Sequence, residues 1–339
     1  MFPTDFTDLL SRNLGQAQAD LILASMTSPK AIGLWENPLR SGQTGSRHLE
    51  HAGSSVGALC QAEGIEGAES VSHALPGFFS VAAPYREALM RSPLVNDGSI
   101  YPMNPASLFA ARALGVQPGD EVLDLAAAPG GKSLVLAAAL SAGGAATGRL
   151  ALVEPIKARF HRLRANMQRC GVLQADYYQR DGRGVGIAVP ERFDRVLLDA
   201  PCSSEARFHS SEPTSTHHWS LRKVRECARK QKSLLKSAFR ALKPGGTLVY
   251  STCSFSLEEN ERIIDGFLRR ETAAALVPVE VADDIKKNFS GAVTEVEAVS
   301  NRTSSKPKMK TLNCAEALRV LPDNLWDGFF LAKITKHRS

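Results

Sequence analysis

Residues 121–140 constrain the fold of this chain more than any other stretch. Residues 121–125 are a short apolar run typical of a buried strand, and residues 133–140 have the composition of a helix. Between them lies a loop of small residues, proline and paired glycine that ends in Lys132. A strand, a glycine-containing loop and a helix in this order open a doubly wound α/β sheet. We therefore expect a cofactor to lie against the bare backbone of this loop.

Two kinds of cofactor are compatible with the loop. Residues 131–133 end like the phosphate-binding loop of P-loop NTPases, but the leading glycine of that motif falls on Ala126. The other interpretation is a nucleoside cofactor held by its ribose and amino-acid ends, chiefly S-adenosylmethionine. A packing turn without any ligand is the third possibility. The residues that follow the later strands distinguish among these three interpretations of the loop.

Downstream of the loop, strand patterns alternate with helical patterns, which indicates a parallel sheet. Strands are predicted at residues 121–125, 150–153, 175–179, 193–198, 247–250 and 329–334, and the last one is expected to close the sheet. Helices are predicted at residues 106–114, 133–140, 156–170, 221–242 and 257–270. The polar residues 280–315 are expected to form an irregular insertion. The predicted architecture is a Rossmann-like, doubly wound α/β domain over residues 101–339.

Residues 1–100 are predicted to be a smaller, mainly helical auxiliary region. Apolar residues recur at roughly helical spacing over residues 6–24, and another short helix is expected within residues 78–90. Residues 41–57 are rich in Gly, Ser and His and are expected to be a loop.

The composition excludes several classes of protein. With 339 residues, 43% of them hydrophobic and 22% charged, the chain can bury a substantial core. No apolar run has the length of a membrane span, and Asp5 and Asp8 stand where a basic leader would be. The six cysteines, at positions 60, 170, 202, 227, 253 and 314, lack metal-site spacing, so no metal is expected. Their scatter fits a reduced cytoplasm.

The positive charge is concentrated beyond residue 100. The first 100 residues hold six Lys/Arg and ten Asp/Glu, leaving 35 and 25 for the rest of the chain. Residues 222–243 carry nine basic residues and one acid, and residues 157–169 carry five basic residues and no acid. One basic helix face is often only solvated surface. Two such segments in one domain favour a polyanionic partner, since phosphate backbones bind where Lys and Arg are dense.

Three acidic residues follow successive predicted strands, namely Glu154, Asp181 and Asp199. Each alone is compatible with a helix cap or a solvated loop. Together they are expected at the carboxyl edge of the sheet, where ligands bind. Glu154 is in position to accept hydrogen bonds from a ribose diol, Asp181 to hold the adenine side, and Asp199 to meet the reacting base. A P-loop NTPase has no use for an acid at the first position, so S-adenosylmethionine is the predicted cofactor.

Two cysteines lie just beyond strands, in residues 199–203 (DAPCS) and 250–254 (YSTCS). A single cysteine is more often a packing residue than a nucleophile. Two at one cofactor edge suit one reaction, because C5 of a pyrimidine attacks a sulfonium methyl only after a thiolate has added to C6. A base must then remove the C5 proton so that the thiol can leave. A cation such as Lys132 would lower the pKa of the thiol, and Asp199, protonated or sharing a proton, would bind N3 of cytosine.

These segments resemble the Sun/RsmB-type RNA cytosine-C5 methyltransferases, in particular the RsmF-like bacterial members. The resemblance covers residues 101–336 and rests on residues 126–132, 159–166, 181–183, 199–203, 250–254 and 327–330. It implies a class I methyltransferase fold, S-adenosylmethionine as cofactor and RNA as partner, ribosomal RNA before transfer RNA. We expect a cytoplasmic monomer without membrane contact, in which residues 1–100 assist RNA binding.

The resemblance also implies the roles of individual residues. Cys253 would be the nucleophile and Cys202 would aid product release, whereas DNA cytosine methyltransferases attack with the Pro-Cys thiol; Asp199 and Lys132 complete the catalytic set. The implied cofactor contacts are Ala126, Ala127, Ala128, Pro129, Gly130, Gly131, Lys132, Glu154, Arg159, Asp181 and Asp199.

The chain departs from the family at Ala126, where Cys is common, and at residues 204–206, where a Gly is expected near the base-entry loop. No PUA-like domain is expected after residue 336 and no NusB-like domain before residue 100. A catalytically inactive RNA-binding relative is a further alternative, although both cysteines and all the acids are present.

Overall fold

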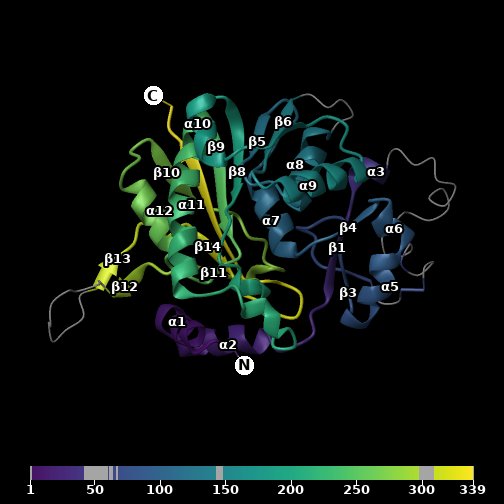
Figure 1. The fold of residues 1–339 in the computed structure, drawn as a ribbon, viewed down its shortest axis with the longest axis horizontal. Coiled ribbons are helices and arrows are strands. Elements are labelled where there is room, and N and C mark those ends of the chain that lie inside the picture. The colour runs from purple at the N-terminus through teal and green to yellow at the C-terminus, as the bar shows by residue number, and fades with distance from the viewer. Residues whose placement is uncertain are drawn as a thin grey trace.

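A mixed sheet forms the centre of the computed structural model, which describes residues 2–41, 60, 64–65, 68–142, 148–297 and 309–338. Its described strands run in the order β11-β14-β15-β9-β8-β5-β6-β7, and β10 also pairs with β15 (Figure 1). The parallel half consists of β5 (Glu121–Asp124), β6 (Arg149–Val153), β7 (Asp176–Tyr178), β8 (Phe193–Asp199) and β9 (Leu242–Thr252). The chain winds outward from β5 in both directions, so the predicted Rossmann-like fold is confirmed, with its switch point between β5 and β8.

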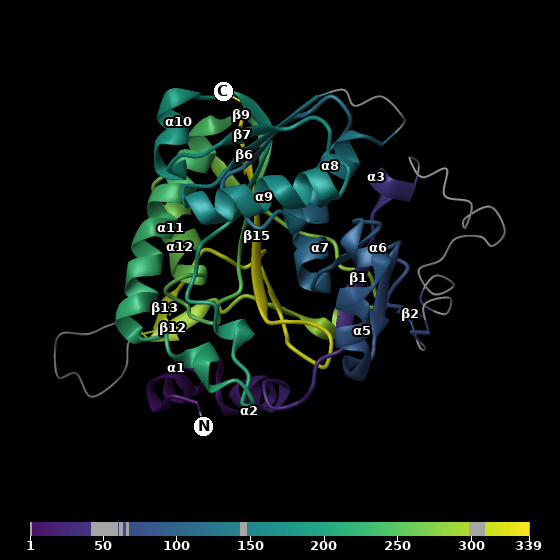
Figure 2. The same ribbon diagram turned by 45° about the vertical axis from the view of Figure 1, so that its right-hand side comes forward.

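Helices cover both faces of this sheet (Figure 2). One face carries α7 (Pro105–Ala113), α8 (Gly131–Leu140) and α9 (Lys157–Arg169), and the other carries α10 (Val185–Ala188), α11 (Leu221–Ala241) and α12 (Glu261–Leu268). Successive residues of β5 serve both layers, because Val122 packs into the first core and Leu123 into the second. Burial on both faces explains why these strands are continuous apolar runs in the sequence.

The antiparallel half of the sheet extends further than expected. β15 (Phe329–Lys336) pairs with β9, but it does not close the sheet, which corrects the prediction. β14 (Leu318–Val320) and β11 (Phe289–Gly291) continue beyond it, and β10 (Ala274–Val277) pairs with its far end. The predicted irregular insertion at 280–315 therefore contains β11 and the paired strands β12 (Glu295–Glu297) and β13 (Met309–Thr311). Residues 298–308 of it lie outside the described residues.

The N-terminal region contains a sheet that the sequence pattern did not predict. β1 (Ile32–Glu36) lies between β3 (Phe78–Val81) and β4 (Ile100–Pro102), and β2 (Glu69–Ser70) pairs with β3; all pairings are antiparallel. Phe78 is thus in a strand, and the helix expected within residues 78–90 is α5 (Arg86–Arg91) with a preceding 3-10 turn. The region also contains the short helices α3 (Pro38–Ser41) and α6 (Pro93–Asn96). β4 crosses the boundary predicted after residue 100, and residues 42–57 of the predicted loop lie outside the described residues.

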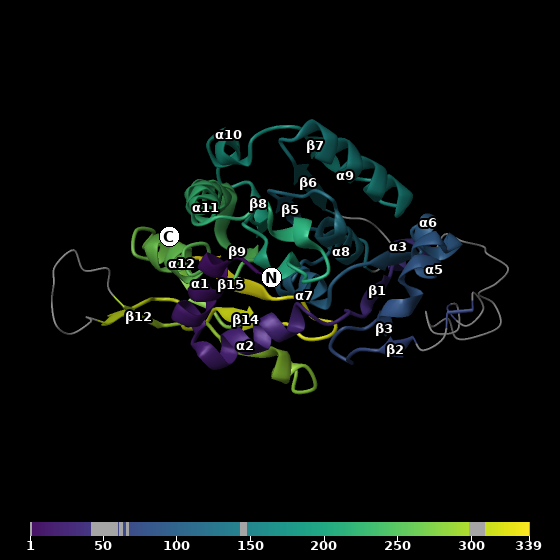
Figure 3. The same cartoon turned by 60° about the horizontal axis from the view of Figure 1, so that its bottom comes forward.

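Two helices, α1 (Thr4–Leu14) and α2 (Gln16–Ser25), replace the single helical stretch expected at 6–24. They break at Gly15, whose φ of 81° favours glycine. Phe6 of α1 packs edge-on against Phe208 and Trp219, with ring centroids 5.0 and 5.6 Å away. Helices α1 and α2 therefore cover the segment that follows β8 (Figure 3). None of the described helices combines the length and apolar character that a membrane crossing requires.

Candidate active site

The loop after β5 follows the carboxyl end of that strand, and the strand order places it at the switch point of the sheet. Leu125 donates its N–H to Leu197 O and Ala127 donates its N–H to Val153 O, both at 3.0 Å. The loop thus continues the hydrogen bonding of both neighbouring strands before it turns into α8. Gly130 makes that turn with φ 114°, and a Cβ there would lie 3.1 Å from the Leu163 side chain of α9. The glycine is required both by the backbone conformation and by the close approach of α9.

A buried carboxyl group fixes this loop from behind. Asp124, 1% exposed, accepts hydrogen bonds from Ser133 Oγ at 2.6 Å and from the N–H of Ala126 at 3.4 Å. Burial raises the pKa of Asp124 to about 6. The sequence pattern did not single out Asp124. Its position as an acidic residue within an apolar strand could have indicated a buried carboxyl group.

Glu154 and Arg159 lie next to the loop. Glu154 ends β6 with its side chain 2% exposed; its Oε1 accepts the N–H of Ile156 at 3.0 Å, and its Oε2 is 3.6 Å from Arg159 Nη2. Arg159 also donates to Ala128 O at 2.7 Å. The guanidinium therefore links the predicted ribose carboxylate to the cofactor loop. Arg159 thus contacts two other predicted cofactor residues, Glu154 and Ala128.

Asp181 is exposed and has a different partner. Its carboxylate accepts the backbone N–H of Arg183 at 2.9 Å and the guanidinium of the same residue at 2.6 Å. The Arg183 side chain holds the pKa of Asp181 below its ordinary value. The adjacent Gly182 packs so closely on Leu125 that a Cβ would lie 3.0 Å from it. Asp181 is thus at the same edge as the loop, but none of its described contacts joins it to Glu154.

Lys132 and Asp199 form the link between the loop and the ends of β8 and β9. Lys132 Nζ lies 2.8 Å from Asp199 Oδ2, 3.1 Å from Ser107 Oγ, and 5.1 Å from the centre of the Phe329 ring. Asp199 Oδ1 accepts the Ser251 hydroxyl at 2.9 Å. Both carboxylate oxygens therefore accept hydrogen bonds, which is the pattern of an ionised group. The contact of Asp199 with N3 of cytosine, which the sequence analysis expects, stays a prediction.

The two predicted cysteines are in contact. Cys202 Sγ and Cys253 Sγ are 3.2 Å apart, and Ser204 Oγ is 3.7 Å from Cys202 Sγ; both thiols are half-buried. The hydrogen bond from Cys202 lowers the pKa of Cys253, the nearby charge of Arg207 adds to this, and burial opposes it. The same contact and burial raise the pKa of Cys202 well above its ordinary value. Of the two thiols, Cys253 is therefore the one that loses its proton more readily.

The cation that acts on Cys253 is Arg207, which sequence reasoning missed. Arg207 ends the short 3-10 helix Glu205–Arg207, in which Ala206 donates its N–H to Cys253 O at 3.1 Å. The Cys253 charge in turn raises the pKa of Arg207. Lys132, which the sequence analysis expects beside the thiol, pairs with Asp199. Only proximity in space identifies Arg207, since it follows no motif.

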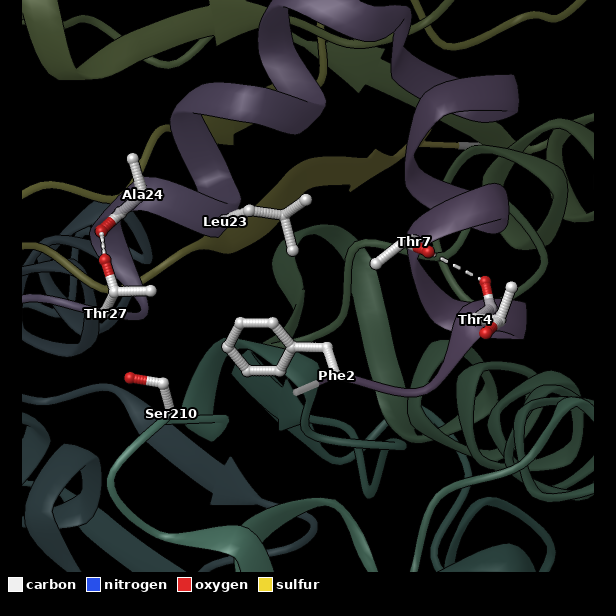
Figure 4. Close-up of a pocket in the computed structure, with 7 residues that line it drawn as sticks. All are labelled: Phe2, Thr4, Thr7, Leu23, Ala24, Thr27 and Ser210. Carbon is white, nitrogen blue, oxygen red and sulfur yellow. Dashed lines mark hydrogen bonds between the residues drawn. The ribbon is translucent and has the colours of Figure 1, made fainter.

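A pocket of about 510 Å³ lies beside the N-terminal helices and is separate from these groups. It is lined by Phe2, Thr4, Thr7, Leu23, Ala24, Thr27 and Ser210 (Figure 4). None of the predicted catalytic or cofactor residues belongs to this lining. Within the described part of the chain, no group of His, Cys, Asp and Glu side chains is arranged to hold a metal ion.

Comparisons of sequence identify the family and several relatives of this chain. Residues 111–335 match the family described as 16S rRNA methyltransferase RsmB/F. The ribosomal RNA small subunit methyltransferase F of Vibrio parahaemolyticus is 38% identical over 247 residues, and that of Serratia proteamaculans is 36% identical over 247 residues. Each match covers 72% of this chain and 46% of the relative. The chain therefore spans about half the length of the curated relatives it matches.

Solved structures show the same fold. A methyltransferase homolog protein from Pyrococcus horikoshii has a TM-score of 0.74 at 27% identity, over 99% of this chain and 95% of that chain. The structure of NSun6 from Pyrococcus horikoshii with SFG has a TM-score of 0.76 at 20% identity, over 100% and 99% of the two chains. At that identity the second likeness concerns the fold alone.

Proposed function

The chain belongs to the 16S rRNA methyltransferase RsmB/F family, and from this membership we propose that it methylates C5 of cytosine in ribosomal RNA through a covalent adduct on Cys253. The family and the fold identify S-adenosylmethionine as the cofactor and remove the P-loop NTPase alternative. The observation that carries the finer proposal is the contact of two thiols, 3.2 Å apart, beside the cofactor loop.

The residues present fit that cofactor. Residues 126–131 have small side chains that let a ligand approach their backbone, and Glu154 has accepting capacity beyond its one backbone hydrogen bond. When bound, S-adenosylmethionine supplies a methyl group on a sulfonium centre. The loop orients the ligand through backbone groups, while Asp124 and Ser133 keep the loop rigid from the buried side. Arg159 joins the loop to Glu154 and so holds both walls of the cofactor site together.

Attack begins at Cys253. Its thiolate forms a bond to C6 of the cytosine, and the electron pair of the C5–C6 double bond moves into the ring, which makes C5 nucleophilic. Negative charge then develops toward N3. Lys132 donates to Asp199 at 2.8 Å and to Ser107 at 3.1 Å, which leaves the third N–H of its ammonium group for a hydrogen bond to that nitrogen. C5 then forms a bond to the methyl carbon, while the bond between that carbon and the sulfonium sulfur breaks and its electron pair leaves with the sulfur as a neutral thioether.

Product release breaks the bond between Cys253 and C6. A base removes the C5 proton, the C5–C6 double bond re-forms, and the C6–S bond breaks so that Cys253 leaves as a thiolate. Cys202 keeps its proton at neutral pH and donates to Cys253, and Arg207 adds a positive charge. Both interactions stabilise the leaving thiolate. This is the physical basis for assigning product release to Cys202.

The RNA contact is assigned to the basic side of α11. The exposed face of this helix carries Arg222, Arg225, Arg229, Lys230, Lys232, Lys236 and Arg240. Val224 and Trp219, at its beginning, pack in the cluster that also contacts Cys253. The first turn of α11 therefore lies near the thiols, and phosphates bound there would bring a nucleotide toward them. The N-terminal region then has an auxiliary role, with α1 and α2 supporting the segment that carries Arg207.

Nucleoside analysis tests this function. The protein is incubated with S-adenosylmethionine and small-subunit ribosomal RNA lacking the modification, and the digested RNA is examined by mass spectrometry, with transfer RNA as the parallel substrate. We expect 5-methylcytidine in the ribosomal RNA. A methyl group on N4 of cytosine or on ribose would refute the C5 assignment. If 5-methylcytidine appeared only in transfer RNA, the substrate would be transfer RNA and not ribosomal RNA.

A further inference from the structure

Two carboxyl groups are buried together behind the thiols and take no part in the chemistry described above. Glu205 and Glu259 are both 0% exposed, and neither belongs to an ion pair among the described residues. Glu205 Oε1 accepts from Trp219 Nε1 at 2.9 Å, and its Oε2 accepts from the N–H of Phe255 at 3.3 Å. Glu259 Oε2 accepts from the N–H of Ser203 at 3.0 Å and from Gln231 Nε2 at 2.8 Å. Burial of two negative charges without a cation is costly, so a neutralising proton is expected.

The hydroxyl group of Ser203 lies between the two carboxyls, and its hydrogen bonds determine how many protons the three groups share. Ser203 Oγ is 2.6 Å from Glu205 Oε1 and is also hydrogen-bonded to Glu259 Oε1. An ionised carboxylate only accepts, and a hydroxyl has one proton to donate. Two hydrogen bonds in a row of three oxygens need two protons, and Ser203 supplies one. One of the carboxyl groups must therefore carry the other.

We assign this proton to Glu259, because burial and the charge of Glu205 raise the pKa of Glu259 to about 8. The resulting chain runs from the Glu259 proton to Ser203 Oγ and from the Ser203 proton to Glu205. The titratable groups facing this chain from the surrounding elements are Cys202, His218, Cys227 and Tyr250.

The chain joins the two segments that hold the thiols. Ser203 directly follows Cys202, whereas Ser254, next to Cys253, donates to Glu259 Oε1 at 3.1 Å. Gln231 of α11 adds a bond to Pro201 O at 3.0 Å. We propose that Glu205 and Glu259 are positioning residues, which share one proton through Ser203 and thereby hold Cys202 against Cys253. This inference rests on the proposed function for its significance, because it explains how the release thiol is kept at the nucleophile.

The proposal has a consequence for alkaline pH. Loss of the Glu259 proton places two anions on either side of one hydroxyl, and the segments that carry them repel each other. The two thiols then separate, although the protein keeps its fold elsewhere. Glu259→Gln replaces the proton donor by an amide donor and removes the titration, so this variant is expected to keep the thiols together across the range.

Infrared spectroscopy of the full chain in heavy water tests the shared proton directly. From about pH 7.5 to about pH 9.5, a range in which Asp124 with its pKa of about 6 is ionised, the wild type is expected to lose the carbonyl band of one protonated carboxylic acid, with a midpoint near pH 8. The band should be missing in Glu259→Gln, present in the matched variant Glu258→Gln, and shifted to a lower midpoint in Glu205→Gln. Glu258 is a suitable control because it is half-exposed and pairs with Arg262. A wild type without the band at neutral pH overturns the proposal, even if a variant fails to fold.

Trapping with phenylarsine oxide, which bridges two adjacent thiols, tests the positioning. Peptide mapping detects the bridge between Cys202 and Cys253. Because this experiment needs neither RNA nor cofactor, a failure of the positioning proposal is distinguishable from a failure of the proposed methyl transfer. We expect trapping in the wild type to fall several-fold between neutral pH and about pH 9.5, and to stay level in Glu259→Gln. Thiol ionisation alone drives reactivity upward with pH, so a fall is not explained by the thiols. Trapping that rises equally in both proteins overturns the proposal.

Discussion

The cofactor half and the thiol half of the site are built in different ways. The cofactor loop is held by one strand–loop–helix unit, with Asp124 and Ser133 behind it and backbone hydrogen bonds to the adjacent strands. The thiol half is assembled from the segment after β8, the segment after β9 and the beginning of α11, with α1 packed over them. A local unit keeps its geometry by itself, whereas an assembled one depends on distant contacts. The two halves should therefore respond differently to substitution.

The largest expected effect separates chemistry from binding. Cys253→Ala should lower methyl transfer by at least about a thousandfold, because the covalent route is lost. Its affinity for S-adenosylmethionine, measured by calorimetry, should equal that of the wild type, since no cofactor residue changes. Weakened cofactor binding in this variant would show that the two halves are not independent.

A second variant addresses the cofactor half. Glu154→Ala should weaken S-adenosylmethionine binding by about 10- to 100-fold, as expected from the loss of charge-assisted hydrogen bonds worth about 1.5–3 kcal/mol. Asp176→Asn, on the neighbouring strand β7 and paired with Arg149 at 2.5 Å, is the matched control and should bind normally. Tight magnesium-dependent binding of ATP to the wild type would contradict the cofactor assignment.

RNA binding distinguishes α11 from the N-terminal region. Replacing Arg222, Lys223 and Arg225 by Glu should lower RNA affinity by about tenfold and flatten its dependence on salt, because phosphate contacts are lost. Cofactor affinity should stay the same. The control carries three equal charge reversals in the N-terminal region, at Arg12, Arg86 and Arg91, and is expected to bind RNA as the wild type does. If the control weakens binding and the α11 variant does not, the N-terminal region is the RNA surface.

The smallest effect concerns stability and pH in the thiol half. Glu259 has a pKa of about 8 in the folded protein and an ordinary, lower value when unfolded, so the folded state binds the extra proton between these values. Stability from this group is complete below the unfolded pKa and declines as pH rises toward 8. Between about pH 7 and pH 8 the unfolding free energy should drop by about 1 kcal/mol, measured by urea denaturation. Glu259→Gln should remove this slope, and an unchanged slope would contradict the assignment of the proton.

The same contrast explains what can be predicted from the sequence. The parallel strands and the cofactor loop are readable because continuous apolar runs and small-residue turns are local signals. The N-terminal sheet escaped notice because its strands are short and pair across long connections, as β1 does with β4. β14 and β11 are three residues each and gain their place only by pairing with β15 and with each other.

The individual site residues follow the same rule. Cys202, Cys253 and Glu154 stand at strand ends, so their common edge follows from topology alone. Arg207 and Glu205 lie in a 3-10 turn whose position depends on packing against Trp219 and Phe255. Glu259 matters because it meets Ser203, 56 positions earlier in the chain. Such contacts come from tertiary packing and leave no periodic signal.

The covalent mechanism is tested most directly by a denaturing gel of the two cysteine variants with labelled RNA and S-adenosylmethionine. Cys202→Ala should accumulate a denaturant-resistant protein–RNA adduct, because Cys253 still attacks and release is slow. Cys253→Ala and the double variant should show no adduct. An adduct in Cys253→Ala together with an inactive, adduct-free Cys202→Ala would make the Pro-Cys thiol the nucleophile, and an active Cys253→Ala without any adduct would contradict covalent catalysis by this chain.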